Sequence, residues 1–340
     1  MTDGAQAPAG PRSFGRRLAR IAAVPLVLAL VVYASFQVSP WPGAMLVRVV
    51  FGIGDARTVA ALQKHVPAGV VAHIDVAYDP GDPDGRLDIY HPPEGTAPLT
   101  TIVWIHGGGW VSGDKAQIGP YARILAARGF TVVSVQYSIA PEARYPTPVR
   151  QAMVALAYLT ARAAAYRIDP DRIVLAGDSA GAQIAAQTAA IASSPDYARA
   201  VDITPGIERR QIIGTLLFCG GYDIDAARGG GIGGWFVHTV LWAYSGRKDF
   251  LSDPVFRRMD VTDHLTAAFP PAFISAGNGD PLAPQSVALA RRLEGLGVRV
   301  DRLFFAADHK PALPHEYQFN LDDADGRMAL ERAVAFLKGL

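Results

Sequence analysis

One serine of this chain stands in a segment that could carry nucleophilic chemistry. The segment reads GDSAG, and Ser179 at its centre follows the apolar run DRIVLAG and opens a predicted helix. A hydroxyl at such a strand-to-helix turn projects from a tight bend, and the helix N-terminus favours a developing negative charge. The alternative is that Ser179 only caps the helix. The position predicts the nucleophile of an acyl-transfer reaction.

Three consecutive glycines precede that serine by about seventy residues, in the segment IHGGGW. A run of glycines leaves backbone N–H groups unobstructed, and two or three such donors can stabilise the oxyanion of a tetrahedral intermediate. We expect the donors to be Gly107 and Gly108, with Ala180 as the third and Gly109 as an alternative to one of the first two. His106 fits a role in holding this loop through a backbone hydrogen bond better than a role as catalytic base.

The two motifs together resemble a known family. HGGGW and GDSAG at this distance, with the stretches LDIYHP, IVWIHGGGWVSGDK and VVSVQYSIAPEARYPTPVRQ, are similar to the hormone-sensitive-lipase-like group of α/β-hydrolase esterases, near its feruloyl- and acetyl-esterase-like branch. The resemblance covers roughly residues 70–340. It implies a serine carboxylic-ester hydrolase that acts on short-chain or aryl esters through an acyl-enzyme, without a cofactor or metal. Two alternatives stay open: amide or lactone cleavage at the same site, and a catalytically silent binding protein of this fold.

The same resemblance implies the chain order serine, acid, histidine. Asp280 follows the next-to-last predicted strand, where a carboxylate can orient an imidazole. Two histidines follow the last predicted strand in ADHKPALPHEYQFN. His309 has the family's usual separation from the acid, whereas His315 has the family's usual position before an aromatic residue, a short loop and the final helix. We favour His315 as the base, although Glu316 stands where the family usually has glycine.

The elements that must position these residues alternate along the chain. Continuous apolar strands alternating with helices indicate a mostly parallel sheet covered by helices on both faces, with the first two strands as an antiparallel edge. The expected fold class is α/β, and the resemblance specifies the α/β-hydrolase fold. Strands are predicted over 70–78, 86–92, 100–106, 131–137, 171–177, 211–218, 271–277 and 298–305, and helices over 117–129, 147–166, 179–192, 284–296 and 324–339.

Residues 220–268 interrupt this alternation, and we expect an inserted lid there. The glycine cluster at 229–234 lacks the strand and the Lys-Ser/Thr pair of a phosphate loop, so a flexible hinge of the lid is the better interpretation. Aromatic side chains of the segment could form an acyl or aryl pocket, and ordinary packing would use the same residues. They are Trp235, Phe236, Trp242 and Tyr244.

The N-terminus has a different composition from the rest. Residues 1–20 are rich in Gly, Pro and Ala and then basic, and we expect them to be disordered. Residues 21–39 begin with IAAVPLVLALVVYASFQV, an uncharged stretch about long enough to span a bilayer. Arginines before it predict a signal-anchor with the catalytic domain outside the cytoplasm; cleavage near Ala34, giving a secreted protein, is the alternative. Residues 40–69 are expected to be a helical connector or part of a cap before the catalytic domain at 70–340.

The overall composition limits the partners. The chain has 340 residues and a net charge of +1, which gives no basic face for nucleic acid. Cys219 is the single cysteine, so no intrachain disulfide can form, and its apolar surroundings predict a buried strand residue. No His/Cys/Asp cluster has metal-ligand spacing. The expected partners are a small ester substrate and, through the N-terminal helix, a membrane.

Overall fold

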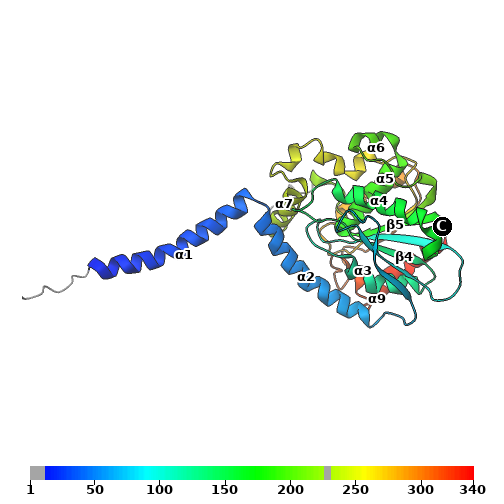
Figure 1. Ribbon diagram of the computed structural model, residues 1–340, viewed down its shortest axis with the longest axis horizontal. Helices are drawn as coiled ribbons and strands as arrows, with labels where there is room; N and C mark the ends of the chain where they lie inside the picture. Colours follow the sequence, from blue (N-terminus) through cyan, green and yellow to red (C-terminus); the bar gives the residue numbers. More distant parts are fainter. Residues whose placement is uncertain (1–11, 226–230) are drawn as a thin grey trace, which may run out of the picture.

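The computed structural model describes residues 12–225 and 231–340. An α/β body is built on one sheet, and a long helix, α1 (Arg12–Val38), extends away from it (Figure 1). Residues 12–20, which we expected to be disordered, form the first turns of α1, because the helix of the apolar segment continues through them. Residues 1–11 lie outside the described residues.

A single eight-stranded sheet forms the centre of the body, in the order β1-β2-β4-β3-β5-β6-β7-β8. The pairs β1–β2 and β2–β4 are antiparallel, and all other pairs are parallel, as the apolar strand pattern predicts. The strands are β1 (Val71–Ala77), β2 (Arg86–His91), β3 (Leu99–Ile105), β4 (Thr131–Val135), β5 (Ile168–Asp178), β6 (Ile212–Phe218), β7 (Ala272–Ala276) and β8 (Val300–Phe304).

Helices cover both faces of this sheet and bury two apolar cores. The helices α3 and α9 pack on one face, and α4, α5 and α8 pack on the other. Every residue of β4 and β7 is buried, because both faces of these strands are covered. The helices are α3 (Lys115–Ala126), α4 (Thr147–Ala161), α5 (Ser179–Ser193), α6 (Pro195–Val201), α7 (Gly231–Ser245), α8 (Ala283–Gly295) and α9 (Ala324–Lys338).

The segment between β6 and β7 contains α7, and after it the short 3₁₀ helices Phe250–Ser252, Phe256–Met259 and Val261–His264. Glycines 229 and 230 of the expected hinge lie outside the described residues. From Gly231 onward the glycine cluster belongs to α7, so this part of it is helical.

The helix α2 (Trp41–Gln63) is packed onto the body, beside α3 and α7. Arg48 holds it there through hydrogen bonds to the backbone oxygens of Val111 and Ala140 and an ion pair with Glu142. At Gly43 the helix approaches α7 so closely that a Cβ would lie 2.6 Å from a side-chain carbon of α7. The expected helical connector is therefore a single helix that covers one edge of the sheet.

A sharp bend separates α1 from α2. Among the helices whose side chains are described, none is by itself both long and apolar enough to cross a bilayer. The pair formed by Val24–Val38 and Trp41–Gln63, bent by 92°, meets that requirement by length and composition.

Candidate active site

Ser179 lies at a strained turn between β5 and α5. Its φ is +51°, in the left-handed region that non-glycine residues rarely adopt. The glycines two residues away on either side allow this turn, because a Cβ at Gly177 would lie 2.5 Å from the Gly181 backbone, and one at Gly181 would lie 2.0 Å from the Ile105 backbone oxygen. A strained residue between two glycines that have no room for a Cβ is typical of a nucleophile elbow.

The glycine loop lies beside this turn. Ile105 of β3 pairs with Gly177 of β5, so the loop that follows β3 reaches the start of α5. Gly108 and Gly109 have φ values of +108° and +60°, which glycine alone adopts without strain. Within the described residues, the N–H groups of residues 107–109 and Ala180 donate no hydrogen bond, so all four remain available to an oxyanion.

His106 is a structural residue of this loop. It is fully buried, donates from Nδ1 to the Gly107 oxygen at 2.8 Å, and stacks on Tyr137 at 4.2 Å between ring centroids. Burial lowers its pKa to about 4, so the ring is neutral at neutral pH. The expected role in holding the loop agrees with this geometry.

Asp280 and His315 form a hydrogen-bonded pair at the same edge of the sheet. Asp280 follows β7, its side chain is fully buried, and its Oδ1 lies 3.0 Å from His315 Nδ1. The backbone N–H of Leu282 donates to the same oxygen at 2.8 Å, which fixes the carboxylate. A carboxylate on Nδ1 leaves Nε2 as the nitrogen that can accept a proton.

His309 has a different partner. Its Nε2 lies 2.8 Å from Asp325 Oδ2 of α9, and its ring packs on Phe305. It therefore ties the loop after β8 to the last helix. Of the two histidines in this loop, the structure brings His315 to Asp280 and holds His309 elsewhere.

Ser179 Oγ makes no hydrogen bond within the described residues. Ser179 follows β5, and Asp280, the hydrogen-bond partner of His315, follows β7. Because β5, β6 and β7 are neighbours in the sheet, Ser179 and the Asp280–His315 pair lie at the same edge. Hydrogen bonds between nucleophile and base often close only when substrate is bound.

A pair of carboxyl groups lies next to the base, and our sequence interpretation did not include it. Glu316 adopts φ +59°, and its carboxyl group lies beside that of Asp178, since an oxygen of each lies within 3.0 Å of the position of a Cβ at Gly107. Burial, and next the charge of Glu316, raise the pKa of Asp178 well above its ordinary value, which favours the protonated form of Asp178. Glu316 Oε1 lies 3.8 Å from His315 Nε2, the ring nitrogen that the Asp280 hydrogen bond leaves available.

These neighbours change the acidity of the base. Burial lowers the pKa of His315, whereas the hydrogen bond to Asp280 and the charge of the Glu316 carboxylate raise it. The net pKa lies well above the ordinary histidine value. The base consequently needs a higher pH than an isolated imidazole to be neutral.

Cys219 lies next to the base, which its apolar sequence context did not indicate. It is buried one residue beyond β6, with φ +45°, and its Sγ lies within 4.8 Å of a ring nitrogen of His315. One ligand atom each of Cys219, Asp280 and His315 lie within 4.8 Å of one another, a spacing that could hold a metal ion. Because the Asp280–His315 hydrogen bond occupies two of these groups, we assign the cluster to acid–base chemistry. Burial raises the pKa of Cys219, so the thiol is protonated at neutral pH.

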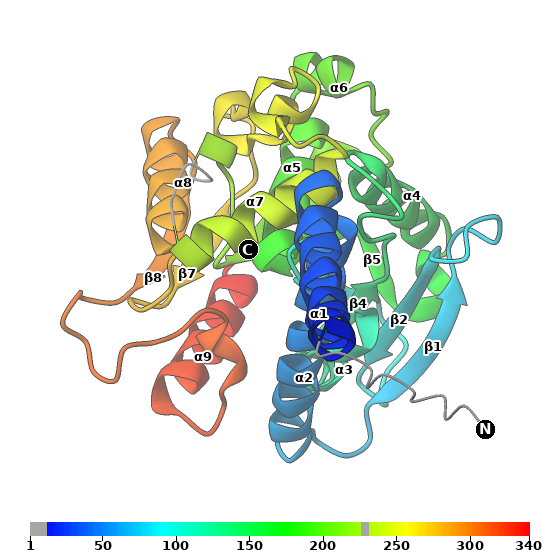
Figure 2. The same ribbon diagram turned by 90° about the vertical axis from the view of Figure 1, so that its left-hand side faces the viewer.

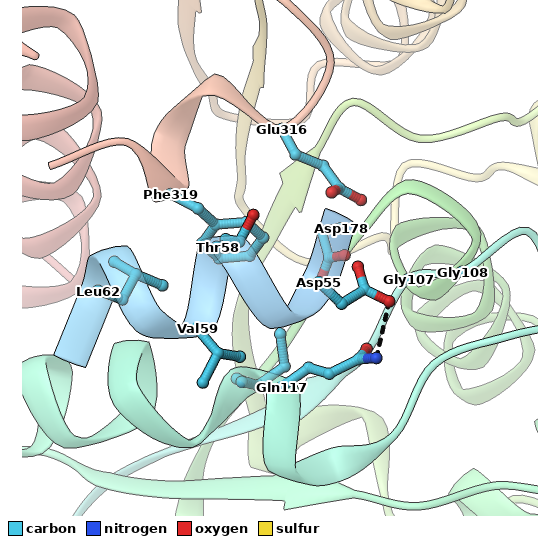
Figure 3. A pocket seen from close by; sticks show the side chains of 11 residues that line it. Asp55, Thr58, Val59, Leu62, Gly107, Gly108, Gln117, Asp178, Glu316 and Phe319 are labelled. Atoms are coloured by element: carbon cyan, nitrogen blue, oxygen red, sulfur yellow. Dashed lines mark hydrogen bonds between the residues drawn. The ribbon is translucent and has the colours of Figure 1, made fainter. Parts of the chain in front are cut away.

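A cavity of about 30 Å³ adjoins the glycine loop, which is room for roughly one water molecule (Figure 3). One side of the cavity is formed by α2, which contributes Asp55 and Leu62 among other residues. The opposite side is formed by Gly107, Asp178 and Glu316. The helix α2 therefore lies over the glycine loop on this side.

Asp55 connects α2 with the carboxyl pair. It accepts a hydrogen bond from Gln117 of α3 at 2.7 Å. Burial, and next the charge of Glu316, raise the pKa of Asp55 to about 6. A residue more than fifty positions before the first motif thus belongs to the site, and only the folded chain reveals it.

Two of the aromatic residues between β6 and β7 lie in different surroundings. Phe236 packs on Phe51 of α2 at 5.5 Å and lies 3.5 Å from the position of a Cβ at Gly109, so it borders the glycine loop. Tyr244 is fully buried and stacks on Trp110 at 5.3 Å, which makes it a core residue.

Comparisons with known proteins agree with this fold. The family described as the alpha/beta hydrolase fold matches residues 102–309. Carboxylesterase NlhH of Mycobacterium tuberculosis is 30% identical over 288 residues, which cover 77% of this chain and 80% of NlhH. Esterase LipQ of the same organism is 27% identical over 236 residues, 66% of this chain and 53% of LipQ, so this chain spans about half of LipQ.

A solved structure extends the comparison. Esterase B of Lactobacillus rhamnosis superposes with a TM-score of 0.73 at 23% identity, over 86% of this chain and 94% of that protein. This likeness shows the fold. Together, the carboxylesterase relatives support an enzyme that hydrolyses esters.

Proposed function

The chain belongs to the alpha/beta hydrolase fold family, and on that basis we propose that it is a serine carboxylesterase that cleaves short-chain or aryl esters through an acyl-enzyme. The observation that carries the proposal is the hydrogen-bonded Asp280–His315 pair, which lies at the same sheet edge as the strained Ser179. The esterase relatives support the type of bond that is cleaved.

Acylation begins with attack of Ser179 Oγ on the ester carbonyl carbon. His315 Nε2 takes the hydroxyl proton, and Asp280 stabilises the imidazolium through Nδ1. The carbonyl oxygen becomes an oxyanion, which the N–H groups of Gly107, Gly108 and Ala180 stabilise. Collapse of the intermediate breaks the bond to the alcohol, and His315 returns the proton to the leaving oxygen.

Deacylation repeats these steps with water. His315 takes a proton from the water as it attacks the acyl-enzyme, the glycine loop again holds the oxyanion, and the proton returns to Ser179 Oγ as the acid leaves. Every step uses side chains and backbone groups of this chain.

A panel of p-nitrophenyl esters of increasing acyl length tests the activity and the substrate class together. We expect turnover of acetate and butyrate that falls with longer chains, and its loss in Ser179→Ala. Wild-type protein that cleaves p-nitroacetanilide or a lactone and leaves all the esters intact would replace ester hydrolysis by the alternative chemistry.

We assign residues 220–268 to a lid. The segment connects β6 to β7, and its helix α7 packs against α2 above the glycine loop. The cavity between α2 and the glycine loop has room for roughly one water molecule, so we infer that α2 or this segment moves when an ester binds there. Limited proteolysis within residues 220–268 should slow when a phosphonate inhibitor occupies the site, and an unchanged cleavage rate would speak against the lid.

We also propose that α1 anchors the enzyme in a membrane, with the catalytic domain outside the cytoplasm. The helix extends away from the body (Figure 1), and most of its described large apolar side chains, such as Leu28 and Val31, are more than half exposed. The uncharged stretch 21–38 is about 27 Å long at 1.5 Å per residue, close to the thickness of a bilayer core. Retention of full-length protein in carbonate-washed membranes, and its accessibility to external protease, test this arrangement; release as a shortened soluble chain would favour signal cleavage.

A further inference from the structure

The outward face of α2 is apolar over its first half. Large aliphatic side chains recur at a spacing of three and four residues, which places them on one face of the helix. They are 48–63% exposed although the helix is docked on the body. These four residues, the outward stripe, are Leu46, Val49, Val50 and Ile53.

The charges of α2 are arranged so that the outward stripe carries no negative group. Asp55 is the one acidic residue of the helix sequence, and it is turned inward to Gln117. Arg48 is paired with Glu142. Arg57 lies on the outward face, three turns after the stripe begins, and has no ion pair in the described part of the chain. An apolar helix face flanked by a free cation suits a lipid interface, where the cation meets phosphate groups.

The geometry of the two N-terminal helices places this stripe against the same surface that α1 would enter. The stripe is continuous in sequence with the exposed apolar side chains of α1. Because α1 and α2 meet at 92°, a bilayer normal along α1 puts α2 in the membrane plane (Figures 1 and 2). Trp41, half exposed at the bend, then lies at the depth where aromatic residues accumulate.

The opposite face of the same helix covers the catalytic loop. Phe51 packs on Phe236 above Gly109, and Asp55 and Leu62 line the cavity beside residues 107 and 108. One helix thus separates the outward stripe from the glycine loop by a single helix thickness, about 10 Å.

We propose that α2 lies in the bilayer interface with its outward stripe among the lipids, and that the enzyme draws its substrate from the bilayer. The substrate class is then esters that partition into the membrane, such as acetates of large apolar alcohols. This inference rests on the proposed esterase activity and on the α1 anchor. It adds a surface, a lipid partner and an entry route that neither of them requires.

The test uses the full-length enzyme in palmitoyl-oleoyl phosphatidylcholine vesicles and two substrates with the same acyl group. The substrates are p-nitrophenyl acetate, supplied in water, and 1-pyrenylmethyl acetate, dissolved in the bilayer. In the variant Val50→Glu/Ile53→Glu we expect kcat/KM for the pyrenyl ester to fall about tenfold. Two carboxylates in the outward stripe make contact with the lipid tails unfavourable, so α2 leaves the bilayer interface. The value for p-nitrophenyl acetate should stay within twofold. Val154→Glu, at an exposed position of α4, is the matched control and should change neither value.

A probe measures the position of the helix independently of activity. A nitrobenzoxadiazole label on Val49→Cys should shift its emission to shorter wavelength in vesicles, and the same label on Val154→Cys should not. Cys219 is buried and does not compete for the label.

The failures are distinguishable. Wild-type protein without turnover of p-nitrophenyl acetate refutes the esterase, and wild-type protein that does not sediment with vesicles refutes the anchor; either result removes the basis of the inference. An active, sedimenting enzyme whose Val49 label shows no shift, or whose glutamate variant keeps full activity on the pyrenyl ester, overturns the inference alone.

Discussion

Replacing Glu316 by glutamine should move the pH dependence of ester hydrolysis to lower pH. The Glu316 carboxylate lies 3.8 Å from His315 Nε2 and favours the imidazolium, which cannot act as a base. Removing that charge lowers the pKa of His315, so the neutral, active imidazole is present at lower pH. The acidic limb of kcat/KM, expected above pH 6.5 in the wild type because the pKa of His315 is raised, therefore shifts downward.

The size of the shift follows from the distance. A unit charge at 3.8 Å contributes about 1 kcal/mol in water and about 4 kcal/mol at an effective dielectric constant of 20. The Glu316 side chain is 32% exposed, so solvent screens it and the lower end applies. We expect a shift of about one pH unit, equivalent to about 1.4 kcal/mol. Asp178 does not take over the charge, because burial is the largest cause of its raised pKa.

The assay is kcat/KM for p-nitrophenyl acetate between pH 5 and 9 for wild type, Glu316→Gln and Asp178→Asn. Asparagine reproduces the shape and hydrogen bonds of a protonated aspartic acid, so Asp178→Asn should leave the limb within about 0.3 pH unit of the wild type. A limb that stays in place in Glu316→Gln, or that moves equally in both variants, would refute the assignment of the negative charge to Glu316.

Three further results are expected. In p-nitrophenyl acetate assays His315→Ala should lower kcat about 10⁴-fold, whereas His309→Ala should retain most turnover. His309→Ala should instead lower the free energy of unfolding by about 1 kcal/mol, because the hydrogen bond to Asp325 is lost. The reverse pattern of activities would identify His309 as the base. Gly181→Ala should destabilise the fold by about 3 kcal/mol, because its Cβ would lie 2.0 Å from the backbone oxygen that ends β3, while Gly295→Ala, with open space around it, should cost nothing in urea unfolding; equal midpoints would contradict this packing. Iodoacetamide at pH 7 should leave activity intact, because Cys219 is buried and its raised pKa keeps it protonated; rapid inactivation would indicate an exposed thiol.

The strands and helices of the body could be predicted well because the physical signal is local. Strands covered on both faces must be apolar at every position, and the predicted stretches 131–137 and 271–277 coincide with β4 and β7 to within two residues. Strand order is less local, yet parallel strands place their carboxyl ends at one edge. Residues that follow different strands, such as Ser179 and Asp280, therefore could be expected to meet.

The parts of the site that the sequence did not reveal depend on long-range packing. Asp55 and Glu316 come from opposite ends of the chain, and no periodicity links them. The sequence did contain one usable signal, because Glu316 stands where the resembling family usually has glycine, and the structure gives this position a left-handed backbone conformation. A side chain retained there at a cost of about 1 kcal/mol indicates a contact that compensates for it. Cys219 was interpreted from its apolar neighbours alone, although it follows the end of a strand beside that of Ser179.

The central claim, that Ser179 is acylated with His315 as its base, is tested most directly by covalent labelling. Full-length enzyme treated with a fluorophosphonate should gain one phosphonyl group per chain, located on Ser179 by peptide mass spectrometry, and lose its activity on p-nitrophenyl acetate in proportion. His315→Ala should react at least a hundredfold more slowly, because the hydroxyl is no longer activated. A label on another residue, or full hydrolysis by Ser179→Ala, would contradict the account.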